Sequence, residues 1–100
     1  MRKRATDENK VIPSSGNVFA DLGFDDAEAQ VLALRADLMA QLARQIEARK
    51  LTQARAAQLL GVSQGRVSDL VCRKVDKFSL DMLVTFAARL GKPATVRLAA

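Results

Sequence analysis

A short polar stretch of the chain, SQGRVSD at residues 63–69, carries hydrogen-bonding groups at helical spacing. At 100° per residue, Gly65, Ser68 and Asp69 fall on one face of a helix, and Gln64 flanks that face. The apolar residues of the segment fall on the opposite side, which leaves the polar face without a packing role. A face this small and polar is suited to hydrogen bonding with a partner.

Basic charge gathers around this stretch. Residues 50–78 carry six basic and two acidic side chains, a net charge of +4, whereas residues 18–49 carry three basic and six acidic ones, a net charge of −3. This asymmetry indicates an anionic partner for the middle of the chain and a cationic partner for the acidic segment. The alternative for both segments is a solvated surface of mixed charge.

The composition argues against an enzyme and against a Cys/His metal site. The chain has no histidine, and its one cysteine, Cys72, has no partner for a disulfide within the chain. Ser-His and Cys-His nucleophile pairs are therefore unavailable, and we expect no enzyme activity, no cofactor and no metal. No apolar run approaches the ~20 residues of a membrane span, and the N-terminus lacks the apolar centre of a signal peptide, so we expect a cytoplasmic protein without membrane contact.

The elements that hold the polar face are expected to be helices. With 49% apolar residues and four aromatic ones, the 100-residue chain is predicted to be all-α, a bundle of four to five helices with a short C-terminal β-strand. Residues 1–17 mix charged residues with Pro, Ser and Gly and are expected to form a flexible arm. Residues 18–100 then form the single folded domain.

The first predicted helix of this domain is long. It begins at about Asp25, an N-cap for which Glu28 completes a capping box, and it ends at about residue 49. One face of this helix carries an apolar stripe that we expect in the core, namely Val31, Leu34, Leu38, Leu42 and Ile46.

Three N-cap residues, Thr52, Ser63 and Ser79, predict three further helices. Gly61 permits the positive φ of a tight turn between the first two of these, and Gly91 ends the last one. The segment ATVRL that follows alternates apolar and polar residues, which favours a short strand at residues 94–98.

The segment LTQARAAQLLGVSQGRVSDL, residues 51–70, resembles the helix-turn-helix of the phage repressor and Xre family. The residues at its signature positions are Gln53, Ala57, Gly61, Val62, Ser63, Gln64, Val67 and Leu70. Together with GNVFADLGF, the long helix, FSLDML and the terminal strand, roughly residues 16–98 are similar to HigA-type antitoxins. This resemblance implies a homodimer that represses its own operon by binding double-stranded operator DNA and neutralises a cognate RelE/HigB-type toxin, an mRNA-cleaving ribonuclease. The alternatives are a stand-alone Xre/phage-type repressor and, in a different class, a helical protein-interaction adaptor.

In a helix-turn-helix, the second helix enters the major groove with its N-terminal turn toward the base edges. The residues predicted to read bases are Gln64, Gly65, Ser68 and Asp69. Gln64 can pair with adenine, or it is merely a polar first-turn residue. Asp69 either accepts from cytosine N4 or pairs along the helix with Arg73. The residues predicted to hold phosphates, or else to lie in solvent, are Thr52, Gln53, Ser63, Arg66, Arg73, Lys74 and Lys77.

Two protein interfaces are also predicted. Apolar anchors beside acidic charge fit a basic RNA-cleaving toxin, and the residues concerned are Val18, Phe19, Leu22, Phe24, Asp25, Asp26 and Glu28. Alternatively, the apolar members cover the end of the long helix and the acidic ones favour its N-terminus through the helix dipole. A homodimer is predicted to form by antiparallel pairing of the terminal strand across a two-fold axis, through Thr95, Val96, Arg97 and Leu98.

Overall fold

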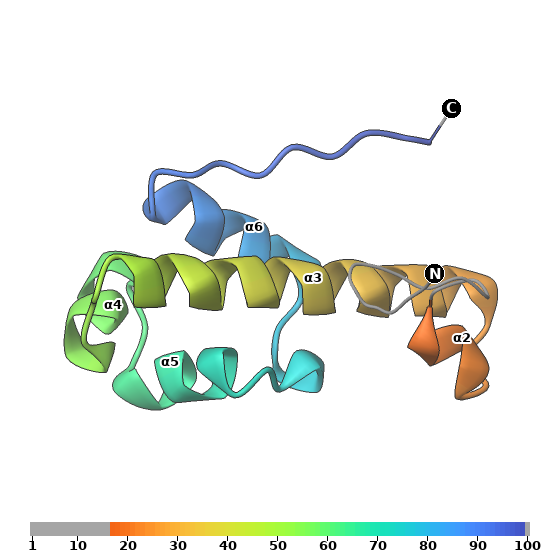
Figure 1. The fold of residues 1–100 in the computed structure, drawn as a ribbon, viewed down its shortest axis with the longest axis horizontal. Helices are drawn as coiled ribbons and strands as arrows, with labels where there is room; N and C mark the ends of the chain where they lie inside the picture. The colour runs from red at the N-terminus through yellow and green to blue at the C-terminus, as the bar shows by residue number, and fades with distance from the viewer. Residues whose placement is uncertain (1–16, 100) are drawn as a thin grey trace. The chain divides into compact units, whose positions relative to one another are not determined.

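The computed structural model describes residues 17–99, and this part of the chain is helical (Figure 1). Its elements are α2 (Val18–Asp21), α3 (Asp26–Ala48), α4 (Gln53–Leu60), α5 (Gln64–Val71), a 3-10 turn η1 (Val75–Lys77) and α6 (Leu80–Arg89). The prediction of a mainly helical chain is therefore confirmed for these residues. The predicted arm lies outside them, apart from residue 17. None of the helices described is long and apolar enough to cross a membrane.

The chain divides into two compact units, residues 1–34 and residues 35–100, so that α3 begins in one and ends in the other. In the first unit, Asn17 caps α2 by accepting from the N–H groups of Phe19 (3.0 Å) and Ala20 (3.4 Å). Its side-chain amide also donates to the carbonyl of Ala29 (3.0 Å), which ties α2 to the first turns of α3. The Asn17 side chain therefore contacts both helices of this unit.

Asp25 caps the start of α3 as the sequence predicted, but within the described residues the Glu28 side chain makes no bond back to the Asp25 N–H, so the predicted capping box is only half formed. The Asp25 carboxylate accepts from the N–H of Glu28 at 2.8 Å. Ahead of this cap, the rings of Phe19 and Phe24 meet edge to face with their centroids 6.2 Å apart.

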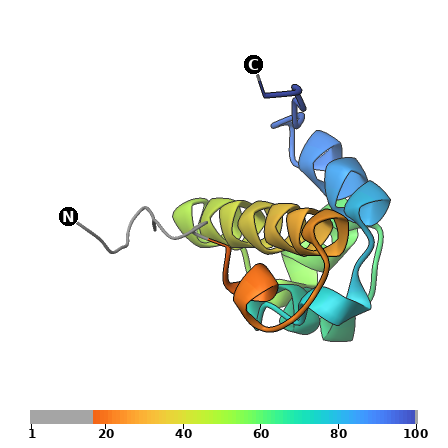
Figure 2. The ribbon, with the colours of Figure 1, turned by 90° about the vertical axis from the view of Figure 1, so that its right-hand side faces the viewer.

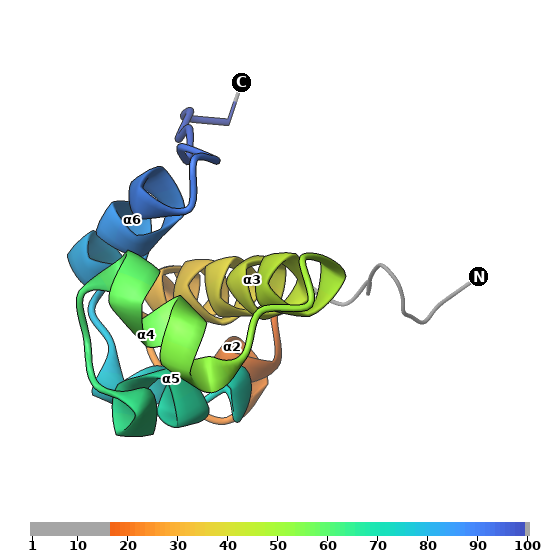
Figure 3. The ribbon, with the colours of Figure 1, turned by 90° about the vertical axis from the view of Figure 1, so that its left-hand side faces the viewer.

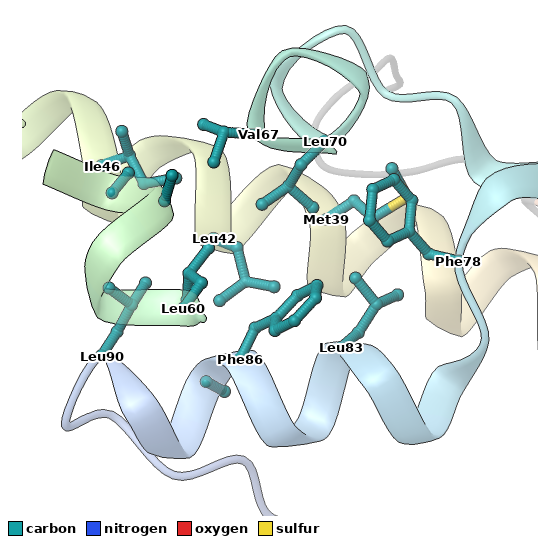
Figure 4. Packing of buried hydrophobic residues seen from close by; sticks show 13 residues of the cluster. Met39, Leu42, Ile46, Leu60, Val67, Leu70, Phe78, Leu83, Phe86 and Leu90 are labelled. Atoms are coloured by element: carbon teal, nitrogen blue, oxygen red, sulfur yellow. The ribbon is translucent and has the colours of Figure 1, made fainter. Parts of the chain in front are cut away.

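The core of the second unit lies between the C-terminal part of α3 and the three helices that follow it (Figure 4). Two views related by rotation place α6 on one side of this part of α3 and place α4 and α5 on another (Figures 2 and 3). The largest side chains that are fully buried come from all four helices, and they are Met39, Leu60, Val67, Leu70 and Leu83. Burying a side chain of this size stabilises the fold by about 1.5–3 kcal/mol.

The three predicted N-caps of this unit are confirmed. The hydroxyl of Thr52 accepts from the N–H of Arg55 (3.0 Å), and Ser63 and Ser79 make the same contact three residues on at 3.2 Å each. These caps set where α4, α5 and α6 begin.

Only part of the predicted stripe on α3 is buried. Leu42 and Ile46 are in the core, whereas Val31 and Leu34 each remain 38% exposed. The helices that cover α3 pack within the second unit, which begins at Arg35, so the stripe is covered only in its later turns. Met39, which lies outside the stripe, is completely buried.

The predicted C-terminal strand is absent from the described part of the chain. Residues 92–99 leave the end of α6 as an extended segment without secondary structure (Figure 1). A strand needs a neighbour whose backbone groups complete its hydrogen bonds, and residues 17–99 of this single chain supply none. Ala94 packs against the core, but Val96 and Leu98 are 73% and 97% exposed.

Candidate nucleic-acid interface

The turn between α4 and α5 is fixed by its own backbone and by α6. Gly61 has a φ of +74°, and the N–H groups of Gly61 and Val62 both donate to the carbonyl of Ala57 at 2.8 and 3.0 Å. The guanidinium of Arg89 on α6 donates to the carbonyl of Leu60, the last residue of α4. A Cβ at Gly61 would lie 2.8 Å from Arg89 Nη1, so a side chain here would strain the φ and displace the end of the Arg89 side chain from the Leu60 carbonyl.

The turn presents α5 with one side buried and its N-terminal turn exposed. Val67 and Leu70 point into the core (Figure 4), and both are at most 1% exposed. Gln64 and Gly65 are exposed, and Ser68 and Asp69 are half-buried. Two of the four predicted base-reading residues, Gln64 and Gly65, thus lie in the accessible first turn of α5, and Ser68 and Asp69 lie one turn further along.

Arg66 is occupied within the fold. Its guanidinium lies 4.5 Å from the centroid of the Phe78 ring, and its Nη2 lies 3.7 Å from the sulfur of Met82. A cation held over a ring face is attracted to the negative ring face. Arg66 therefore connects α5 to the start of α6, a role that the sequence did not indicate for this predicted phosphate ligand.

Asp69 does not pair with Arg73, contrary to one of the two interpretations from the sequence. Its carboxylate lies 3.5 Å from the Lys74 ammonium and 3.9 Å from that of Lys77. Spacing of four residues brings side chains together only within a continuous helix, and α5 has already ended at Val71. The structure thus brings together three of the predicted DNA-contacting residues.

Arg73 occupies the left-handed region, with a φ of +61°. The N–H of Arg73 donates to Leu70 O (3.0 Å) and that of Lys74 to Asp69 O (3.1 Å), the pattern of a Schellman cap, in which glycine is the usual residue. Lys50, with a φ of +54°, ends α3 in the same way. Two exposed cations thus occupy backbone positions in which glycine is the usual residue.

The remaining predicted residues lie at helix starts. Thr52 and Gln53 are exposed at the start of α4, and Ser63 is exposed at the start of α5. We call the residues predicted to contact DNA, without Arg66, the recognition face; its members are Thr52, Gln53, Ser63, Gln64, Gly65, Ser68, Asp69, Arg73, Lys74 and Lys77. No three potential metal ligands come together anywhere in residues 17–99.

Comparison with known families agrees with this geometry. The sequence model of a family described as a helix-turn-helix domain matches residues 18–99. The chain belongs to this helix-turn-helix family and is a DNA-binding protein of that class. No curated protein and no solved structure matches the chain.

Proposed function

We propose that the protein is a transcription regulator that binds operator DNA by laying α5 in the major groove. The observation that carries the proposal is the accessible first turn of α5, with Gln64 and Gly65 exposed while Val67 and Leu70 are held in the core. A glutamine amide in this place can form paired hydrogen bonds with adenine N6 and N7. Gly65 leaves room for the backbone to approach the bases.

The rest of the recognition face suits phosphates. The hydroxyl oxygens of Thr52 and Ser63 accept from backbone N–H groups, which leaves each hydroxyl proton to donate to a phosphate oxygen. The starts of α4 and α5 add the positive ends of two helix dipoles. Arg73 is exposed and supplies a cationic contact. Lys74 and Lys77 are exposed cations that the Asp69 carboxylate neutralises in part, whereas Arg66 is assigned to the fold.

Substitution of Gln64 tests this assignment. Two probes are needed: the duplex that the wild-type protein selects from a random-sequence pool, called the selected duplex, and a random duplex of the same length. Gln64→Ala should lose about 1–3 kcal/mol on the selected duplex and much less on the random one. Gln30→Ala, which removes an exposed amide from α3 in the first unit, is the matched control and should bind like wild type. Equal losses on both duplexes would refute base reading by Gln64.

A homodimer is part of the proposal. One recognition helix makes too few contacts for tight specific binding, and dimers that read half-sites one helical turn apart overcome this. The alternating segment Thr95, Val96, Arg97 and Leu98 is exposed in the single chain, so its edges are open to a second copy. Antiparallel pairing of residues 94–98 would create the strand that one chain cannot form.

Truncation tests the strand. A chain that ends at Ala94 keeps the core contact of that residue and removes the rest of the segment. Sedimentation should give a monomer for this chain and a dimer for the full one. A dimer of unchanged affinity after truncation would exclude the segment from the interface.

We infer further that the regulator is an antitoxin, because the first unit has the properties of a protein-binding surface. Residues 18–34 carry four acidic and no basic side chains, all four exposed. Val18, Leu22 and Phe24 are 59%, 70% and 42% exposed, whereas Phe19 is half-buried and packs edge to face on Phe24, so three of the four apolar residues are accessible to a partner. A ribonuclease that binds RNA phosphates is expected to be basic and would be attracted to such a surface. None of these residues belongs to the recognition face, so the two proposed binding surfaces share no residue.

Calorimetry with a candidate toxin, a basic RNA-cleaving protein of RelE/HigB type, tests the antitoxin role. Leu22→Lys places a charge of the wrong sign among the exposed apolar residues and should weaken binding at least tenfold. Gln64→Ala is the control and should bind this protein like wild type. Absence of any complex with the wild-type chain would favour the stand-alone repressor. The adaptor alternative is disfavoured by the DNA-binding family.

A further inference from the structure

We propose that Asp69 limits the sequence-independent part of DNA affinity by holding Lys74 and Lys77 away from phosphates. The proposal rests on the proposed binding of DNA through α5. In this proposal the Asp69 carboxylate weakens the contacts of the two lysines with phosphates, in place of the base contact that its position on α5 first suggested.

The geometry couples one carboxylate to two cations. Lys74 Nζ lies 3.5 Å from Asp69 Oδ1, and Lys77 Nζ lies 3.9 Å from Oδ2. The backbone holds this arrangement, because the N–H of Lys74 donates to Asp69 O (3.1 Å) and the N–H of Lys77 donates to Lys74 O (3.0 Å). The two lysine side chains are 50% and 49% exposed, whereas the Asp69 side chain is only 22% exposed. The lysines are therefore accessible to DNA while the carboxylate is fixed beside them.

A phosphate that approaches either lysine must compete with this carboxylate. Exposed ion pairs are weak, so the lysines can exchange partners, but the negative charge of Asp69 stays within a few ångströms and opposes each phosphate. Salt screens charges beyond about 10 Å at 0.1 M ionic strength, so distant acidic groups have little effect, whereas this one is too close to be screened. The uncharged amide of Gln64 and hydroxyl of Ser68 do not depend on these ion pairs.

Removal of the carboxylate should therefore strengthen binding to any duplex. Each added phosphate contact steepens the slope of log K against log salt by about 0.9, which corresponds to a factor of about 8 in affinity between 1 M and 0.1 M salt. Asp69→Asn should steepen the slope by about one to two per subunit. It should tighten binding to the random and the selected duplex by similar factors.

Asp76→Asn is the matched control. Asp76 lies in η1 between the two lysines and is exposed, and it forms no ion pair within the described residues. The control removes one negative charge from η1, close in sequence to both lysines, without breaking either ion pair with Asp69. We expect its effect on the slope to be less than half that of Asp69→Asn. Asp69→Ser serves as a second variant and should behave like Asp69→Asn.

A double-variant comparison tests whether Lys74 is the group released. Lys74→Gln should change the salt slope little in the wild-type chain and flatten it by about one unit per subunit in the Asp69→Asn chain. Equal effects in both chains would overturn the proposal, as would equal effects of Asp69→Asn and Asp76→Asn.

The measurements separate this proposal from the proposed function. If the wild-type chain binds no duplex, both the proposed function and the proposed role of Asp69 are refuted. If binding depends on Gln64 but Asp69→Asn weakens binding, only the proposed role of Asp69 is wrong. A loss of affinity confined to the selected duplex would make Asp69 a base contact. A loss on both duplexes would mean that Asp69 holds the lysines in place for phosphate contact.

Discussion

Replacement of Arg73 by glycine should raise stability and weaken DNA binding at the same time. Arg73 has a φ of +61°, and it forms no ion pair in the described part of the chain. Glycine adopts this conformation without steric cost, so the substitution relieves the backbone. It also removes a cation that we assign to phosphate contact. The two effects have opposite signs and can be measured separately.

The size of each effect follows from the geometry. A non-glycine residue pays about 1–2 kcal/mol in the left-handed region. The greater conformational freedom of glycine in the unfolded chain offsets about 0.5–1 kcal/mol of the strain that the substitution relieves. A net stabilisation of about 0.5–1 kcal/mol remains, which raises Tm by about 2–8 °C for a domain of this size. Loss of one phosphate contact should flatten the salt slope by about 0.9 per subunit.

Thermal melting and a salt titration on the random duplex measure the two effects. Lys50→Gly is the control for the backbone, because Lys50 ends α3 with a φ of +54° and should gain similar stability. Arg73→Lys is the control for charge and should keep both the slope and the strained backbone. A more stable Arg73→Gly chain with an unchanged slope would refute the phosphate assignment, and a less stable one would refute the argument from φ.

Three further substitutions, with Leu34→Ala as a comparison, test the contacts that position α5. Gly61→Ala should destabilise the fold by about 1–3 kcal/mol in urea unfolding, because it strains a φ of +74° and displaces the Arg89 guanidinium that donates to the Leu60 carbonyl. Met39→Ala should cost about 2–5 kcal/mol in the same assay, and Leu34→Ala much less, since Met39 is fully buried and Leu34 is 38% exposed. Arg66→Ala should lower stability by about 0.5–2 kcal/mol and leave the salt slope unchanged, because this guanidinium packs on an aromatic ring.

Each of these outcomes can fail in a recognisable way. Wild-type stability of Gly61→Ala would mean that the turn tolerates a side chain. Equal losses at Met39 and Leu34 would contradict the boundary of the core on α3. A flatter slope of log K against log salt for Arg66→Ala would mean that Arg66 contacts a phosphate, as the sequence predicted.

Helix starts could be predicted from the sequence because their signals are local. Thr52, Ser63 and Ser79 each cap a helix through a contact three residues on, so the residue type and its position suffice. The extent of burial on α3 could not be predicted in this way. Periodicity shows which side of a helix is apolar, but only the partner helices determine how far along that side is covered.

The site was predicted with similar limits. The exposed start of α5 follows from its apolar spacing, and the structure agrees. The end of α5 was harder to predict, because the chain reverses at Arg73 in a left-handed conformation for which glycine is the usual residue. This reversal determines which lysines reach Asp69. The role of Arg66 depends on Phe78, which is twelve residues away and is placed by tertiary packing.

Amide chemical shifts of the full chain, recorded with and without the selected duplex, test the central claim most directly. The account predicts that the largest changes fall at residues 63–69, with smaller ones at residues 52–53 and 73–77, and that residues 18–34 are unaffected. Changes confined to residues 18–34, or binding that leaves the amides of Gln64 and Ser68 unmoved, would contradict recognition of DNA through α5.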